Sequence, residues 1–178
     1  GNPRYTNGFN VTLHSDQLEL PLQWRKPKRI FVNSMSDLFH EAIPEEFIAS
    51  VLRTAAKTPW HTYQILTKRA ERLALLAPRL QWPSNVWQGV SIESADYVWR
   101  VRFLRKVPAA IRFLSIEPLL GPIKNLSLRG IDWVIVGGES GPHARAVDPR
   151  WVRQLREHCV ASNTPFFFKQ WGGRFPKA

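Results

Sequence analysis

The sequence predicts an α/β protein whose strands form one parallel sheet, either open or curled into a partial or complete (β/α) barrel. Two observations predict this class. Six short apolar runs alternate with segments of helical period, which is typical of a parallel sheet joined by right-handed crossovers. The chain of 178 residues is also 44% hydrophobic, which is enough to bury one core. We therefore expect a single barrel-like domain over residues 1–178.

The N-terminal part has the least regular pattern. Its first residues are rich in Gly, Asn and Pro, and only Phe9 to His14 is expected to form a short strand. A short helix is expected before Pro21, followed by a basic linker that contains Arg25 to Arg29. We therefore expect the chain to begin in the middle of a loop.

The rest of the chain alternates between strand and helix patterns. Strands are expected at Arg29–Met35, His61–Arg69, Asn85–Ser94, Ile111–Leu120, Ile131–Val136 and Pro165–Gly173. Helices are expected at Glu45–Lys57, Ala70–Leu80, Ala95–Val107 and Asp148–Ala161.

The stretch from Ile131 to Pro149 is the most informative of these units. Its apolar run does not alternate with polar residues, which favours a parallel strand covered on both faces. Gly137 and Gly138 then allow a sharp turn or the close approach of a ligand. Asp148 and Pro149 are typical of a helix N-cap and first helical residue. A tight turn with one solvated carboxylate, Glu139, explains the same residues equally well.

Polar residues recur where each expected strand ends. They are Asn33, Ser34, Asp37, Lys68, Arg69, Ser91, Glu93, Glu117, Glu139, Lys169 and Gln170. In a barrel such residues converge on one mouth, so we predict a cavity that Glu93, Glu117 and Glu139 line with Lys68 or Lys169. Such a cavity suits a polar, partly charged ligand. Any one of these residues alone is explained by an ordinary loop.

The formal net charge of +11 favours an anionic partner, such as nucleic acid, a nucleotide or a phosphorylated substrate. Arg102, Arg105 and Lys106 share one face of an expected helix and are the best candidate patch for nucleic acid. A solvated outer helix face is the preferred explanation of the same pattern. The sequence contains no apolar run long enough to cross a membrane and no signal peptide, so we expect a cytoplasmic protein.

Several classes of site are excluded or disfavoured by the motifs. The single cysteine, Cys159, cannot form an internal disulfide, and alone it cannot hold zinc or an iron–sulfur cluster. The five histidines lack the spacing HExxH. Neither GxSxG nor the GxxxxGK[ST] phosphate loop occurs, and GGESG is not the dinucleotide fingerprint.

Six motifs in this order resemble one known family. They are FVNSMSDLFH, ILTKR, VWQGVSIES, FLSIEPLLGPI, DWVIVGGESGP and FFFKQWG, and the resemblance covers nearly the whole chain, from about Phe9 to Gly173. The chain resembles a bacteriophage-associated family of uncharacterised proteins that are similar to radical S-adenosylmethionine (SAM) enzymes. The resemblance implies a barrel of the TIM or radical SAM type, with SAM and the substrate bound at its mouth.

The resemblance also implies roles for the motif residues. Asn33, Ser34, Asp37, Ser91, Glu93, Gly137 and Gly138 are candidates for binding the cofactor, and Lys68, Glu117, Glu139 and Lys169 are candidates for catalysis. Members of the family usually carry, upstream, a cysteine group that holds a 4Fe-4S cluster, and this sequence has none. The chain therefore resembles either a fragment or a degenerate homologue that lacks the first strand and the cluster loop.

Two hypotheses of function follow. In the first, the chain is the barrel portion of a radical-SAM-like protein of unknown reaction, and it is inactive by itself because it lacks the cluster cysteines. It then binds SAM weakly if at all, through Ser91 and Glu93, where related folds hold the ribose. In the second, the chain is a basic, non-catalytic barrel that binds nucleic acid or a partner protein.

Overall fold

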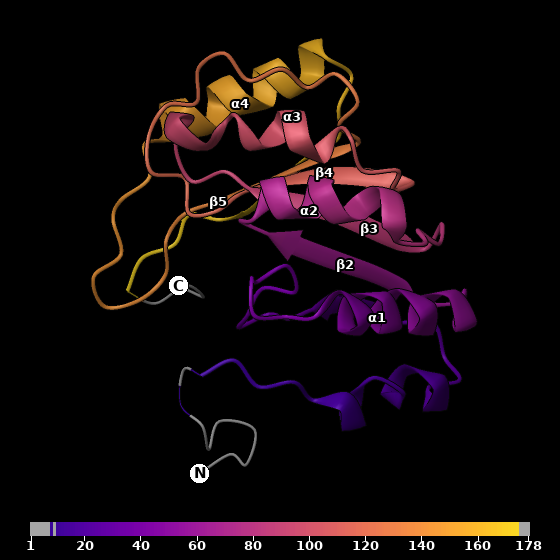
Figure 1. Cartoon of the computed structure of the whole chain (residues 1–178). Helices are drawn as coiled ribbons and strands as arrows, with labels where there is room; N and C mark the ends of the chain where they lie inside the picture. Colours follow the sequence, from indigo (N-terminus) through magenta and orange to yellow (C-terminus); the bar gives the residue numbers. More distant parts are fainter. Residues whose placement is uncertain (1–7, 9, 175–178) are drawn as a thin grey trace.

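The computed structural model describes residue 8 and residues 10–174, and its centre is a sheet of six parallel strands (Figure 1). The strands are β1 (Arg29–Val32), β2 (Thr62–Thr67), β3 (Val86–Ser91), β4 (Ile111–Ile116), β5 (Trp133–Gly137) and β6 (Phe166–Gln170). They neighbour one another in chain order and curl into a half-barrel. The six expected strands and their parallel pairing are thus confirmed.

Helices connect most of the strands. They are α1 (Glu45–Lys57), α2 (Ala70–Leu76), α3 (Arg100–Leu104) and α4 (Pro149–Ala161), with short 3-10 turns η2 (Ser15–Gln17), η3 (Leu20–Gln23), η4 (Ala77–Arg79) and η5 (Ala95–Tyr97). In Figure 1, α1 lies lowest, α2 above it, and α3 and α4 highest, so the helices follow the sheet in chain order. The bounds of α1 agree with the prediction, and Asp148 caps α4 by accepting a hydrogen bond from the Arg150 N–H.

The expected helix over residues 95–107 is wrong in its extent. The Ser94 hydroxyl accepts the Asp96 N–H and starts a 3-10 turn, so the segment divides into η5 and the five-residue α3. The apolar side of the prediction holds, because Val101 and Leu104 are buried.

The N-terminal expectations also need correction. Phe9 lies outside the described residues, and residues 10–14 form no strand. The short helix before Pro21 is replaced by the two turns η2 and η3, the second of which contains Pro21. The physical reason is that this segment bonds to the loop before β2: the Trp60 indole N–H donates to the Trp24 carbonyl over 3.0 Å.

One face of the sheet is packed against the helices. Alternate residues of each strand point to this face, and Ile65, Val90, Leu114 and Val136 there are fully buried. The core continues into α1, where Ile48 is also fully buried. The sheet and its helices thus form one apolar layer that holds the strand ends in place.

The opposite face, which we call the inner face, is not closed in the described part of the chain. Residues Arg29, Phe31, Gln64, Leu66, Trp87, Gly89, Ser91, Phe113, Ser115, Trp133, Ile135, Phe167 and Lys169 share it, as the strand register shows. The prediction that β5 is covered on both faces is therefore wrong, since Trp133 and Ile135 are only half-buried. The reason is that a half-barrel leaves β1 and β6 unpaired with each other.

Candidate functional site

The carboxyl ends of all six strands lie along one edge of the half-barrel, which we call the carboxyl edge. Two of the predicted lysine–glutamate combinations form there: Lys68 with Glu93, and Lys169 with Glu117. The third carboxylate, Glu139, pairs with Arg145 from its own loop. The structure therefore brings the predicted residues to one edge as two separate ion pairs and one separate loop contact.

Glu93 is the most buried of these carboxylates. One oxygen, Oε1, lies 2.5 Å from Lys68 Nζ, and the other accepts a hydrogen bond of 3.0 Å from Arg100. The side chains of Glu93 and Arg100 are only 8% and 9% exposed, whereas that of Lys68 is 58% exposed. In the described part of the chain, the partner of the buried Glu93 Oε1 is therefore the exposed ammonium of Lys68.

The surroundings of Glu93 explain why one of its cations is fixed and the other is free to move. Arg100 also donates to the Ser91 carbonyl over 2.8 Å, and its guanidinium lies 4.2 Å from the ring of Tyr97. Lys68 has no such packing, since its long side chain extends into solvent. The carboxylate is therefore held by Arg100, and Lys68 covers it as an exchangeable partner.

The second pair joins strands further along the sheet. Lys169 Nζ of β6 lies 2.9 Å from Glu117 Oε2, beyond the end of β4, and the glutamate side chain is 18% exposed. A Cβ on Gly137 of β5 would lie 3.3 Å from Glu117 Cδ, so the glycine leaves room for this carboxylate between the two strands.

Gly138 and Glu139 serve contacts within the chain. A Cβ on Gly138 would lie 1.7 Å from the Trp171 carbonyl oxygen, so glycine is required by the loop after β6. Arg145 donates to both oxygens of Glu139 over 2.7 Å, and its backbone N–H donates over 2.9 Å. These side-chain and backbone hydrogen bonds lower the pKa of Glu139 to about 2.

Asp37 connects the exits of β1 and β2. Its carboxylate accepts hydrogen bonds from the N–H groups of Phe39 and Lys68, from the Thr67 hydroxyl, and from Arg69 over 3.0 Å. With four donors, Asp37 is occupied by the fold itself. The other two predicted residues of this exit are more open: Asn33, at φ 61, donates to the Ser36 hydroxyl over 2.8 Å, and Ser34 is exposed.

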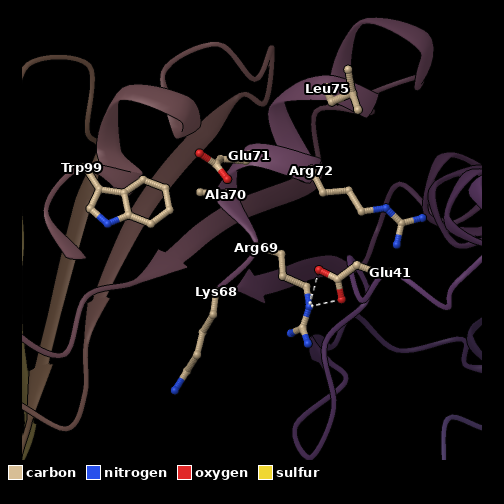
Figure 2. A pocket seen from close by; sticks show the side chains of 8 residues that line it. All are labelled: Glu41, Lys68, Arg69, Ala70, Glu71, Arg72, Leu75 and Trp99. Carbon is tan, nitrogen blue, oxygen red and sulfur yellow. Dashed lines mark hydrogen bonds and ion pairs between the residues drawn. The ribbon is translucent and has the colours of Figure 1, made fainter. Parts of the chain in front are cut away.

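A pocket of about 500 Å³ opens beside these exits (Figure 2). Glu41, Lys68, Arg69, Ala70, Glu71, Arg72, Leu75 and Trp99 line it. In Figure 2, Arg69 faces Glu41, while Lys68 points away from Arg72. Arg69 is neutralised by Glu41. Arg72 donates to the neutral carbonyls of His40 and Ile43, which hold its guanidinium in place without neutralising its charge.

The predicted basic patch on α3 is narrower than expected. Arg105 donates to the carbonyls of Ser127 and Arg129, each over 2.8 Å, and therefore supports a loop. Arg102 and Lys106 are exposed and lie 4.7 and 5.3 Å from the ring centroid of Phe103. No carboxylate in the described part of the chain forms a salt bridge with either of them.

Sequence reasoning missed two residues of this edge. Arg100 holds Glu93, and Arg145 holds Glu139. A signal for Arg100 was present, because it directly precedes Val101 of the apolar side of α3, where an arginine needs a buried partner. Arg145 lies in an irregular loop and offered no comparable signal.

The described residues contain neither a metal-binding cluster nor a membrane-spanning helix. No group of three or more His, Cys, Asp or Glu side chains there is placed to hold a metal ion. No helix among those residues is both long and apolar enough to span a bilayer. Burial on α4 raises the pKa of the Cys159 thiol to about 11, so the thiolate is disfavoured at neutral pH.

Comparison with known proteins gives one match. The model of the family described as "Protein of unknown function (DUF5131)" matches residues 2–178, and the chain belongs to this family. No curated protein and no solved structure matches the chain.

Proposed function

We propose that this member of the DUF5131 family binds S-adenosylmethionine at the carboxyl edge, as the barrel portion of a phage-associated, radical-SAM-like protein. The six ordered motifs suggest the family relationship, and the parallel half-barrel is compatible with a barrel of the TIM or radical SAM type. Ligands of α/β folds bind at the carboxyl ends of parallel strands, where the two lysine–glutamate pairs lie.

The observation that carries this proposal is that the buried oxygen Glu93 Oε1 has the exposed ammonium of Lys68 as its partner and makes no hydrogen bond to a buried group of the described chain. A buried carboxylate oxygen needs a donor, and a hydroxyl of a ligand can take the place of Lys68. A ribose hydroxyl is such a donor. Lys68 is more than half exposed and can leave the carboxylate as the ligand arrives, while Arg100 keeps Glu93 in position.

The residues of this sequence do not fit a 4Fe-4S cluster. Such a cluster needs several thiolates, and the only cysteine, Cys159, is buried on α4 with a raised pKa. We therefore assign no redox step to these residues. Their proposed part is to bind and orient the ribose through Glu93 and to surround the ligand with the Glu117–Lys169 pair.

Isothermal titration calorimetry with SAM and with its demethylated product tests the proposal. We expect weak binding, because this sequence lacks the cysteines of an iron–sulfur cluster that would bind the amino and carboxylate groups of SAM. The Glu93→Gln variant should bind about tenfold more weakly than the unaltered protein. Glu45→Gln is the matched control, since Glu45 pairs with Arg79 elsewhere on the surface. Absence of binding, or equal binding by the Glu93 and Glu45 variants, contradicts the proposal.

A second candidate function is the binding of nucleic acid through α3. The observation that favours it is the exposure of Arg102 and Lys106 without carboxylate partners, in a chain of net charge +11. Phosphate contacts make affinity fall with salt. In filter binding, Arg102→Ala with Lys106→Ala should weaken retention of every sequence alike and flatten the salt dependence. If the double variant retains nucleic acid as well as the unaltered protein, Arg102 and Lys106 do not form a nucleic-acid-binding surface.

A further inference from the structure

Aromatic side chains gather on the inner face of the half-barrel. The ring of Trp133 lies 6.0 Å from that of Trp87, 5.9 Å from that of Phe113 and 6.2 Å from that of Phe167. These four residues come from four adjacent strands, β3 to β6. Phe31 stands on the same face of the first strand, β1.

The strand register shows that this cluster belongs to an accessible surface. Gly89, Phe113 and Trp133 are neighbours across three strands, and the Phe113 ring covers Gly89, where a Cβ would lie only 2.4 Å away. Phe113 is itself almost fully buried under the other rings, whereas Phe167 is 49% exposed and Phe31 is 46% exposed. Parallel sheets normally have both faces covered, so aromatic residues left accessible on one face indicate a binding surface.

The charges of the inner face indicate the chemistry of its occupant. None of the strand positions that share this face carries Asp or Glu, and the charged residues among them are Arg29 of β1 and Lys169 of β6, of which Lys169 is paired with Glu117 beyond the end of β4. Gln64, Ser91 and Ser115 add hydrogen-bonding groups. An aromatic surface bordered by Arg29, in a chain of net charge +11, suits flat rings that are joined by an anionic backbone.

We propose that the inner face is a stacking platform for the unpaired bases of a single-stranded nucleic acid. A second copy of the chain does not fit, because two inward-curved faces cannot pack against each other and the two chains, each of net charge +11, repel. An amphipathic helix needs a continuous apolar groove, and polar side chains interrupt this face. Bases offer π-faces to Phe167, Trp133 and Phe31 whatever their sequence.

This surface differs from the two surfaces of the proposed function. Arg102 lies on α3 and Lys106 lies in the turn that follows it, and α3 packs through Val101 and Leu104 against the other side of the sheet. Glu93 lies beyond the end of β3, whereas the aromatic cluster lies within the strands. Stacking on the inner face therefore depends neither on Glu93 nor on Arg102 and Lys106, and the inner face shares Lys169 with the proposed SAM site.

Binding of a fluorescently labelled 12-nucleotide oligothymidylate, measured by anisotropy, tests the inference. Phe167→Ala should weaken binding about tenfold, and Phe31→Ala should weaken it by a smaller factor, because each removes a stacking surface. Phe167→Trp keeps an aromatic face and should bind within about twofold of the unaltered protein. The same strand paired in a duplex should bind at least about tenfold more weakly, since its bases are not free to stack.

The matched control is Val160→Ala on α4, which removes an exposed apolar side chain from the other side of the sheet. It should leave oligothymidylate binding unchanged. Equal binding by Phe167→Ala and Val160→Ala, or equal binding of single strand and duplex, overturns the inference. Calorimetry of SAM with Phe167→Ala should match the unaltered protein, so failure of base stacking and failure of the SAM site are distinguishable.

Discussion

The two ends of the parallel sheet are held by different chemistry. At the amino ends of β1 to β3, buried side chains bond to the backbone: His61 accepts the Lys28 N–H at Nδ1 and bonds to the Pro21 carbonyl through Nε2. At the carboxyl edge, carboxylates meet lysines and arginines that are partly exposed. The neutral end fixes the strands, and the charged end is the one that a ligand, salt or pH can rearrange.

The largest loss of stability is expected at the neutral end, from Asn85→Ala. The amide nitrogen of Asn85 lies 2.9 to 3.0 Å from the carbonyl oxygens of Ala55, Thr58 and His61, and it joins the end of α1 to the start of β3. The carbonyls of Ala55 and Thr58 keep backbone donors, but the loss of the Asn85 hydrogen bonds should lower the free energy of unfolding by about 2–4 kcal/mol, as measured by urea denaturation.

Asn85→Asp serves as the companion variant, because it keeps the shape of the side chain and removes the donor. It should be destabilised to a similar degree. A variant as stable as the unaltered protein would show that these hydrogen bonds do not fix the neutral end.

Asp37→Asn tests whether one carboxylate of the carboxyl edge contributes to stability as much as the hydrogen bonds at the amino ends of the strands. Asp37 accepts four hydrogen bonds, and an amide would place its own N–H groups against some of those donors. We expect a loss of about 2 kcal/mol in the free energy of unfolding. Glu41→Gln is the control, because Glu41 is the other partner of Arg69 and its side chain is 69% exposed.

Equal stability of the Asp37 and Glu41 variants would mean that Asp37 is as replaceable as a surface ion pair. In that case its predicted role in binding a cofactor would regain support, since the fold would not need its four contacts.

A smaller effect is expected from acid at Glu139. Its folded-state pKa of about 2 lies below the ordinary value of 4.5, so its ionised form stabilises the fold above about pH 4.5. This contribution is lost as pH falls from about 4.5 to about 2, because the carboxylate then protonates and releases Arg145. Urea denaturation of Glu139→Gln should show a weaker dependence on pH over that interval, and an unchanged dependence would contradict the assignment.

Much of the fold could be predicted from the sequence because its signals are local. The apolar runs located all six strands, and the pattern Asp148–Pro149 located the start of α4. The limits of the helix at residues 95–107 could not be read in the same way, since a single Ser94 hydroxyl decides where its first turn ends. The inner face was also hidden, because an apolar run is the same whether a second layer covers it or leaves it accessible.

The candidate site was predictable only to the level of the sheet edge. Parallel strands must bring Lys68, Glu93, Glu117 and Lys169 to one edge, and they do. Which cation meets which carboxylate depends on loop geometry, so Glu139 could not be assigned to Arg145 beforehand. The sequence predicted a sharp turn or the close approach of a ligand at Gly138. In the structure, the group that approaches this glycine is the carbonyl of Trp171.

Binding of SAM at the carboxyl edge through Glu93 is tested most directly by a crystal structure of the protein soaked with the demethylated product of SAM at saturating concentration. We expect the ligand at the carboxyl edge, with a ribose hydroxyl within hydrogen-bond distance of Glu93 Oε1, Lys68 moved away and Arg100 in place. Ligand bound elsewhere, or an edge that stays empty with Lys68 still on Glu93, would contradict it.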